Sequence, residues 1–264
     1  MFEDQMKIAY IGIDLFLPAL EYLMKRCEIA EIFTCKTDNL TEFNTGVIEC
    51  AKKNGVPYTT SRITAEDVKR LKEKSCDFAI CAGYYYKIPT DTDLPLVNIH
   101  PSLLPFGRGP WPMPLDILYK REKSGVTIHK MDDGFDTGDI LLQREFALSD
   151  GENLETFMKK ACSLLPEMLD ELLSDFPRLY REAKPQGSGE YVNMPSEDMY
   201  TIFPTTPYET AERILRAFYG YDCYYVSKDR KYRLIRAKAA EGDGGEGTFP
   251  VKGGYITSER IDLV

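Results

Sequence analysis

The sequence predicts an α/β protein: a doubly wound, mostly parallel sheet followed by a small β-rich C-terminal subdomain. The first half supports the sheet, because short apolar runs alternate there with helical patterns. Beyond residue 190 the pattern changes to short strand-like runs separated by glycine-rich turns. A chain of 264 residues has room for one large domain and such an appendage.

The first part of the chain predicts a β-α-β unit. Strands are expected at Lys7–Ile11 and Ala30–Cys35, with a helix from Leu15 to Lys25 between them. Thr64 and Asp67 then fit a capping box, which indicates the start of a helix that runs to about residue 74. Strands alternating with helices favour a parallel sheet with helices on both faces.

The next strands are expected at Asp77–Gly83 and Leu96–Ile99. Parallel sheets bind ligands beyond the carboxyl ends of their strands, and Gly83 and Asn98 lie at or near such ends. Two more strands, Gly125–Met131 and Asp139–Phe146, are joined by the loop Asp132–Gly138, and a long amphipathic helix follows at Leu154–Leu173.

A composition change indicates a domain boundary. Residues 185–190 begin with Pro185-Gln186-Gly187-Ser188-Gly189, which is typical of a linker. We therefore expect a catalytic domain over residues 1–184 and a subdomain over residues 191–264. The elements expected in the subdomain are a helix at Thr210–Tyr219 and strands at Tyr224–Val226, Tyr232–Ala237, Thr248–Lys252 and Tyr255–Ile261.

Charge and composition exclude several classes of protein. A net charge of -9 and a pI near 5.0 disfavour broad nucleic-acid binding, which needs many Lys and Arg contacts. Seven cysteines without a Cys-x-x-Cys pair are typical of reduced thiols in a cytoplasm. The acidic start of the chain and the lack of a long apolar run predict a cytoplasmic protein without membrane contact. Two histidines and no clustered cysteines predict no metal site, and neither a dinucleotide nor a P-loop motif is present.

Two segments carry the chemistry. The first reads Asn98-Ile99-His100-Pro101-Ser102-Leu103-Leu104-Pro105, and the second reads Asp136-Thr137-Gly138-Asp139. Acyl transfer to an amine passes through a tetrahedral intermediate with charge on oxygen, which an amide and a cationic imidazole can stabilise. In an extended segment Asn98 and His100 project to one side. Asp136 could then hold the imidazole, raise its pKa and relay the proton lost by the attacking amine.

Each of these residues also has a structural interpretation. A single histidine at a strand end is often only hydrogen-bonded, and Asp-Thr-Gly-Asp alone is often a turn. We assign His129 to structure or to support of the site. The run Tyr84-Tyr85-Tyr86 fits either a pocket that accepts aromatic groups or an ordinary strand end.

At these residues the chain resembles the folate-dependent formyltransferases, a methionyl-tRNA formyltransferase-like family that includes sugar-nucleotide N-formyltransferases. The resemblance is carried by Asn98–Pro105, Arg108–Pro112, Gly125–Asp132 and Gly134–Leu141. It implies a formyltransferase fold with 10-formyltetrahydrofolate as cosubstrate and no metal. It also implies roles for individual residues: catalysis by Asn98, His100 and Asp136, and folate contacts by Ser102, Leu103, Leu104, Pro105, Tyr86, Ile88, Asp132 and Gly138.

The acceptor is expected to be a small-molecule primary amine, such as an amino-sugar nucleotide or an amino acid derivative. The helix at Thr210–Tyr219 and the strands after it resemble a reduced form of the C-terminal barrel of methionyl-tRNA formyltransferase. However, Thr37–Asn44 lacks that enzyme's basic, glycine-rich loop, and the acidic charge disfavours tRNA while leaving it possible. A formyltetrahydrofolate hydrolase and a binding module without turnover are further alternatives, and an oligomer is possible.

Overall fold

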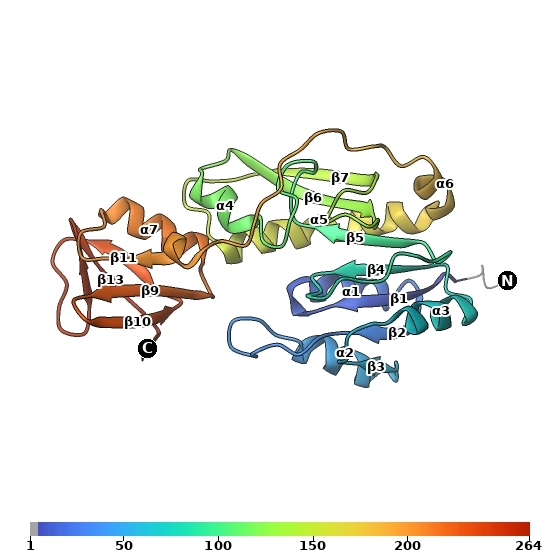
Figure 1. Ribbon diagram of the computed structural model, residues 1–264, viewed down its shortest axis with the longest axis horizontal. Helices are drawn as coiled ribbons and strands as arrows, with labels where there is room; N and C mark the ends of the chain where they lie inside the picture. Colours follow the sequence, from blue (N-terminus) through green and yellow to red (C-terminus); the bar gives the residue numbers. More distant parts are fainter. Residues whose placement is uncertain (1–4) are drawn as a thin grey trace. The chain divides into compact units, whose positions relative to one another are not determined.

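A seven-stranded sheet, in the strand order β3-β2-β1-β4-β5-β6-β7, dominates the first part of the protein (Figure 1). The computed structural model describes residues 5–264. Contacts divide the chain into two units. The first unit comprises the residues up to Gly109 with Gly125–Phe146 and Lys160–Tyr191, and the second comprises Pro110–Ser124, Ala147–Lys159 and Val192–Val264. The domain boundary expected from the sequence stays a prediction.

The elements of the large sheet follow the expected order closely. Its strands are β1 (Lys7–Gly12), β2 (Glu28–Phe33), β3 (Tyr58–Thr59), β4 (Phe78–Ala82), β5 (Leu96–His100), β6 (Lys123–Lys130) and β7 (Ile140–Ala147). The helical elements between and after them are η1 (Asp14–Phe16), α1 (Leu17–Leu23), α2 (Thr45–Asn54), α3 (Ala65–Glu73), α5 (Leu154–Ser174) and α6 (Phe176–Arg181).

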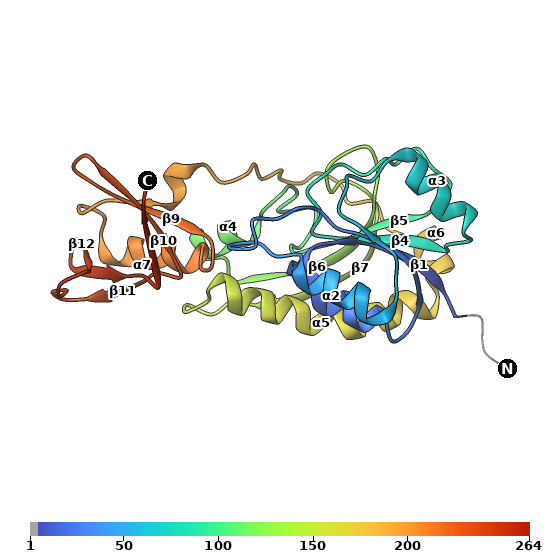
Figure 2. The same cartoon turned by 90° about the horizontal axis from the view of Figure 1, so that it is seen from below.

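The sheet is mostly parallel, as predicted. Strands β3, β2, β1, β4 and β5 pair in parallel, whereas β6 pairs with β5 in the antiparallel sense. Helix α3 covers one face, and α1, α2 and α5 lie on the other (Figure 2). Under α3, Val68 and Leu71 pack with Ala9, Phe33 and other buried side chains into an apolar cluster. This burial is the main force that holds the strand ends, and so the site loops, in place.

Helix α2 was not predicted from the sequence. The backbone amides of Gly46 and Val47 in its first turn both donate to the Asp14 carboxylate, at 2.8 Å. A carboxylate satisfies the free amides at a helix start and interacts favourably with the helix dipole. Because this cap comes from about thirty residues earlier in the chain, local sequence patterns do not indicate it.

The second unit is β-rich, as predicted, and contains two antiparallel sheets. One has the order β14-β10-β9-β8, in which only β8 and β9 pair in parallel, and the other has the order β11-β13-β12. The elements are α4 (Met113–Leu118), η2 (Glu197–Tyr200), β8 (Thr201–Ile202), α7 (Tyr208–Ala217), β9 (Asp222–Ser227), β10 (Arg230–Ile235), β11 (Lys238–Glu241), β12 (Phe249–Val251), β13 (Gly254–Thr257) and β14 (Arg260–Leu263).

The prediction of a single strand at Tyr255–Ile261 was wrong. The chain breaks there into β13 and β14, which belong to different sheets. At the break the hydroxyl of Ser258 donates to the carbonyls of Ile235 and Arg260, at 3.0 and 2.7 Å. A side chain that competes for backbone groups ends strand pairing locally, and this competition is absent from a pattern of apolar residues.

The capping box of α3 gives a first prediction. Thr64 accepts a hydrogen bond from the Asp67 amide, and the Asp67 carboxylate accepts one from the Thr64 amide, as the sequence indicated. Thr64→Ala should lower the free energy of unfolding by about 1 kcal/mol in urea denaturation, because a helix-start amide loses its partner. Thr60→Ala, at an exposed position nearby, is the control; equal effects of the two substitutions would contradict the assignment.

Candidate active site

The pairing of β5 with β6 places polar side chains on one face. Asn98 lies directly opposite His129 in this antiparallel pair, and His100 lies opposite Thr127. Opposite residues of an antiparallel pair point to the same side of the sheet. Between them, Ile99 is buried in the core. Both histidines of the chain therefore lie on the face that carries Asn98.

The loop between β6 and β7 presents Asp136 to this face. The Asp132 carboxylate accepts hydrogen bonds from the Gly134 amide at 3.1 Å and from the Thr137 hydroxyl at 2.7 Å, which tightens the turn. A side chain at Gly138 would come within 2.1 Å of the Lys130 carbonyl oxygen, so glycine is required there. Asp136 itself has a φ of 56°, in the left-handed region that non-glycine residues seldom adopt.

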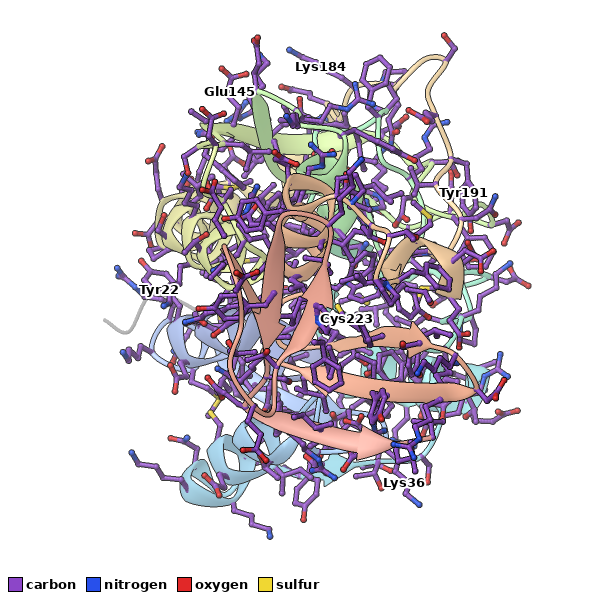
Figure 3. All side chains as sticks on the ribbon, turned by 90° about the vertical axis from the view of Figure 1, so that its left-hand side faces the viewer. Tyr22, Lys36, Glu145, Lys184, Tyr191 and Cys223 are labelled. Atoms are coloured by element: carbon purple, nitrogen blue, oxygen red, sulfur yellow. The ribbon has the colours of Figure 1, made fainter. Side chains whose placement is uncertain are left out.

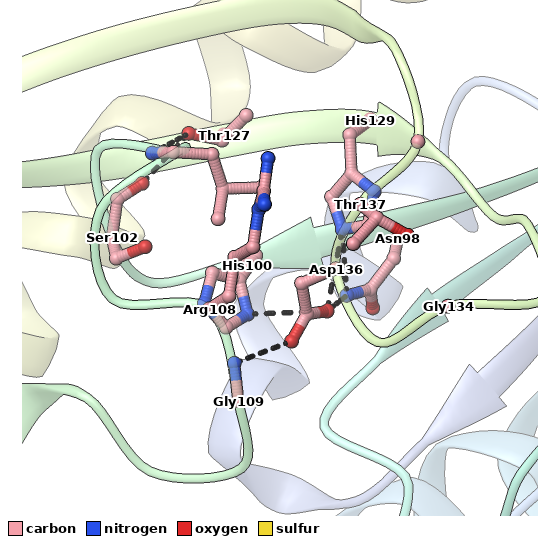
Figure 4. Close-up of polar contacts among 12 residues, drawn as sticks. Asn98, His100, Ser102, Arg108, Gly109, Thr127, His129, Gly134, Asp136 and Thr137 are labelled. Atoms are coloured by element: carbon pink, nitrogen blue, oxygen red, sulfur yellow. Dashed lines mark hydrogen bonds and ion pairs between the residues drawn. The ribbon is translucent and has the colours of Figure 1, made fainter. Parts of the chain in front are cut away.

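The Asp136 carboxylate is surrounded by polar groups (Figure 4). Its Oδ1 accepts a hydrogen bond from the Asn98 amide at 3.2 Å and lies 3.6 Å from His100 Nδ1 and 3.5 Å from His129 Nε2. Its Oδ2 accepts from the Gly109 amide at 2.9 Å. The side chain is 16% exposed. The structure thus brings together the three predicted catalytic residues.

These neighbours keep Asp136 ionised. Burial alone would raise the pKa of the carboxyl group, but His100, His129 and the Gly109 amide together lower it to about 2. Hydrogen bonds and positive charge favour the ionised form of a carboxyl group. The site therefore holds a negative charge at neutral pH, in a position with little access to water.

His100 is neutral in this arrangement. Burial lowers its pKa, and the nearby Asp136 charge and the hydrogen bond to Gly107 offset this only in part. Its Nε2 donates to the Gly107 carbonyl at 2.7 Å, because a carbonyl oxygen can only accept. The Nδ1 atom therefore faces Asp136 without a proton and can take one up beside the carboxylate.

His129 belongs to the same cluster, and whether it supports the site or is structural stays a prediction. Its Nδ1 donates to the Lys130 carbonyl at 2.6 Å, which leaves Nε2 to accept from the Asn98 amide at 3.2 Å. The Asn98 amide is thus held by Asp136 and His129 together. His129 could be placed at the site only from the antiparallel register of β5 and β6, in which it lies opposite Asn98.

The segment after β5 is folded back on itself. The Ser102 hydroxyl donates to the Phe106 carbonyl at 2.8 Å, and the Leu104 amide donates to the Thr127 hydroxyl at 3.3 Å. Gln143 donates to the Leu104 carbonyl at 2.8 Å, and the peptide bond from Leu104 to Pro105 is cis. Ser102 and Leu104 are buried, while Leu103 and Pro105 are partly exposed. Their role in folate contact stays a prediction.

The loops that carry Tyr86 and Asp132, both expected to contact folate, touch each other. The Lys87 ammonium donates to the Asp133 carbonyl at 3.0 Å, and the Thr90 hydroxyl donates to the Asp133 carboxylate at 2.7 Å. Tyr86 is 40% exposed, whereas Ile88 is buried in the apolar cluster under α3. The loops of Tyr86 and Asp132 therefore lie side by side, and the Ile88 side chain is buried in the core.

Comparison with known proteins identifies the family. The model of the formyl transferase family matches residues 30–173. The chain belongs to this family. That result confirms the resemblance found in the sequence around Asn98, His100 and Asp136, all of which lie within the matched range.

Individual relatives show the extent of the similarity. Methionyl-tRNA formyltransferase of Ehrlichia ruminantium (strain Gardel) is 36% identical over 185 residues, which are 69% of this chain and 59% of that protein. The chain thus spans about three fifths of this curated relative's length.

Two solved structures share the fold. HypX from Aquifex aeolicus in complex with tetrahydrofolic acid aligns with 98% of this chain and 44% of its own, at a TM-score of 0.75 and 15% identity. A 4-N formyltransferase from Francisella tularensis aligns with 88% of this chain and 98% of its own, at a TM-score of 0.69 and 20% sequence identity. These likenesses confirm the predicted formyltransferase fold.

None of the helices in residues 5–264 is both long enough and apolar enough to cross a membrane. The same residues contain no group of three or more histidine, cysteine, aspartate or glutamate side chains arranged to hold a metal ion.

The lowered pKa of Asp136 predicts a specific pH dependence. The folded-state pKa of about 2 lies below the ordinary value of 3.8, so the stabilisation is present above pH 4 and is lost as the pH falls through 2. The difference in unfolding free energy between the wild type and Asp136→Asn should shrink by about 2 kcal/mol between pH 5 and pH 2. Urea unfolding at a series of pH values measures it.

Thr60→Ala is the control for this measurement, because it changes no titrating group and its difference from the wild type should not vary with pH. A difference between wild type and Asp136→Asn that is the same at pH 5 and pH 2 would show that the carboxylate is not stabilised by its neighbours.

Proposed function

We propose that this protein transfers a formyl group from 10-formyltetrahydrofolate to a primary amine. The observation that carries the proposal is the convergence of Asn98, His100 and an ionised Asp136 on one face of the sheet. Membership of the formyl transferase family supports the reaction type. The amine is the nucleophile, so no covalent enzyme intermediate is required.

In the proposed reaction the amine nitrogen attacks the formyl carbon, and the carbonyl oxygen becomes negatively charged. Once His100 has taken up the amine proton, the imidazolium so formed and the Asn98 amide stabilise this negative charge, and such electrostatic stabilisation commonly supplies a large part of the rate enhancement. The amine proton passes to the pair of His100 and Asp136. As the bond from the formyl carbon to the carrier nitrogen breaks, the pair returns the proton to that nitrogen.

The neutral resting state of His100 suits this role. Its unprotonated Nδ1 faces a carboxylate that is already ionised, so a proton taken up there is stabilised by the opposite charge. Its other nitrogen is fixed by the Gly107 carbonyl, which sets the orientation of the ring. In this proposal Asp136 therefore stabilises the proton that the His100 ring takes from the amine.

The surroundings fit a folate carrier in their chemistry. A pterin ring is flat and needs both apolar contact and polar backbone groups. The touching loops of Tyr86 and Asp132 combine exposed aromatic side chains with turns rich in backbone amides and carbonyls. The solved HypX complex with tetrahydrofolic acid, which shares this fold, supports the same carrier. The predicted contacts of Ser102 to Pro105 and of Gly138 remain part of this proposal.

For the acceptor, we propose a small-molecule amine, such as an amino-sugar nucleotide or an amino acid derivative. The net charge of -9 disfavours a polyanion, which normally binds to a positive surface. The second candidate is charged initiator tRNA, which the name of the 36% identical relative favours. Solved proteins with this fold carry both kinds of names, methionyl-tRNA formyltransferase and sugar N-formyltransferase, so both acceptors enter the test.

Substitution in the cluster tests the reaction. His100→Asn and Asp136→Asn should each lower kcat by roughly 10² to 10⁴, because proton transfer and oxyanion stabilisation are lost. The release of tetrahydrofolate from 10-formyltetrahydrofolate, followed with a suitable amine present, gives the rate. Thr60→Ala should retain the wild-type rate; wild-type rates in both active-site variants would refute the assigned roles.

An acceptor panel tests the choice of amine. Purified protein is mixed with 10-formyltetrahydrofolate alone, then with amino-sugar nucleotides, amino acids or charged initiator tRNA. Turnover that depends on a small amine is the expected result, whereas saturable formylation of the tRNA would favour the second candidate. Release of formate without any acceptor would indicate a hydrolase and contradict transfer.

A further inference from the structure

Residues 184–191, here called the strap, run from the end of α6 across the site loops. Figure 3 labels Lys184 and Tyr191 at its two ends. Lys184 pairs with Ile140 at the start of β7, with reciprocal backbone hydrogen bonds of 2.8 and 2.9 Å. At the other end, the Glu190 carbonyl accepts from the Arg108 amide at 3.1 Å. The segment that looked like a linker in the sequence is therefore hydrogen-bonded along its length.

Gln186 lies in the middle of the strap and binds the catalytic loop directly. Its side-chain amide donates to the carbonyl of Asp136 at 3.0 Å and to the carbonyl of Gly138 at 2.6 Å. These bonds hold the backbone on both sides of Thr137. They also hold Asp136 in its left-handed conformation, which persists only where neighbours enforce it.

The other end of the Gln186 side chain binds the second site loop. Its Oε1 accepts from the Nε and Nη2 atoms of Arg108, at 3.0 and 2.9 Å, and Arg108 also donates to the Gly187 carbonyl at 3.0 Å. Arg108 directly precedes Gly109, whose amide binds the Asp136 carboxylate, and follows Gly107, whose carbonyl binds His100. Gln186 thus joins the loop of Asp136 to the loop of Gly107 and Gly109, and these two loops hold the catalytic cluster.

The strap approaches these loops too closely for it to shift freely. A side chain at Gly189 would come within 2.1 Å of the Pro105 carbonyl oxygen, and the Glu190 amide donates to that same oxygen at 3.2 Å. Short contacts of this kind require glycine and keep the strap against the loop of His100.

We propose that Gln186, through Arg108, is a positioning residue that sets Asp136 against Asn98 and His100. This proposal rests on the proposed formyl transfer, since positioning matters through the reaction that the cluster performs. Gln186 needs no contact with the substrate. It acts by fixing the backbone at Asp136 and the Arg108–Gly109 segment in one relative position, and a displacement of about 1 Å at a reacting group can cost roughly 10²-fold in rate.

A side-chain amide meets both demands at once. Its amide nitrogen donates twice and its oxygen accepts, whereas a carboxylate can only accept. In Gln186→Glu the bonds to Arg108 are kept, but a negative charge faces the carbonyls of Asp136 and Gly138. In Gln186→Met both sets of bonds are lost with little change in size.

Steady-state kinetics with 10-formyltetrahydrofolate and the best amine from the acceptor panel give the first test. Gln186→Met and Gln186→Glu should lower kcat by roughly 10-fold to 100-fold, with KM for 10-formyltetrahydrofolate changed less than threefold. Ser188→Ala within the strap and Gln5→Met outside it are the controls and should keep the wild-type kcat. Equal kcat in Gln186→Met and the wild type overturns the proposal.

A double-mutant cycle separates positioning from general stability. If Gln186 acts through Asp136, Gln186→Met should lower kcat little further in an Asp136→Asn background. Independent effects that multiply would assign Gln186 to structure alone and overturn the proposal. The midpoint of thermal unfolding is measured for each variant and shows that the variant is folded at the temperature of the kinetic assay.

Hydrogen exchange at the Gly109 amide tests the geometry without any turnover. The bond from this amide to Asp136 should open more often in Gln186→Met, so its exchange rate should rise about tenfold while the amides of β1 keep theirs. If the wild type transfers no formyl group yet exchange at Gly109 rises, the proposed function fails and the positioning role stands. Unchanged exchange at Gly109 overturns the positioning role.

Discussion

A carboxylate with little access to water is stable only where donors surround it, and Asp136 is such a group. Its donors come from two parts of the chain, the Asn98 side chain on β5 and the Gly109 amide in the loop after β5, and His129 on β6 holds the Asn98 amide in turn. Without these partners, burial would favour the neutral acid. The charge of Asp136 therefore depends on the correct assembly of the sheet and the loops, and the orientation of both His100 and Asn98 depends on that charge.

The same interaction links the fold to the proposed chemistry. Strand β5 pairs in parallel with β4 and in the antiparallel sense with β6, and this antiparallel register places His129 opposite Asn98 and Thr127 opposite His100. The loop before β7 then has to turn sharply to reach this face, which explains the left-handed backbone at Asp136 and the glycine at position 138. The strap through Gln186 holds this strained turn. The site is thus organised by backbone contacts as much as by the side chains that would touch a substrate.

Periodicity and motifs in the sequence predicted the sheet, most of its strands and the cluster of Asn98, His100 and Asp136. They did not reveal helix α2, because its cap, Asp14, is distant in the chain. The place of His129 depends on strand register, and the roles of Gly109 and Gln186 depend on contacts between segments. Residues 185–190 have the composition of a linker, and composition alone gives no sign of their hydrogen bonds. Local sequence patterns therefore located the proposed catalytic residues, whereas the residues that hold them in place could be identified only from the three-dimensional structure.

The ionised Asp136 carboxylate should govern the protonation of the His100 imidazole. NMR titration of His100 in the wild type and in Asp136→Asn, with His129→Gln used for assignment, measures this dependence. The charged or titrating groups that face His100 are Asp136 and His129. In the wild type we expect a His100 pKa below its ordinary value and a proton on Nε2 at neutral pH. In Asp136→Asn the His100 pKa should fall further, because the substitution removes the charge and keeps the shape. A His100 pKa that stays the same or rises in Asp136→Asn would refute control by the carboxylate.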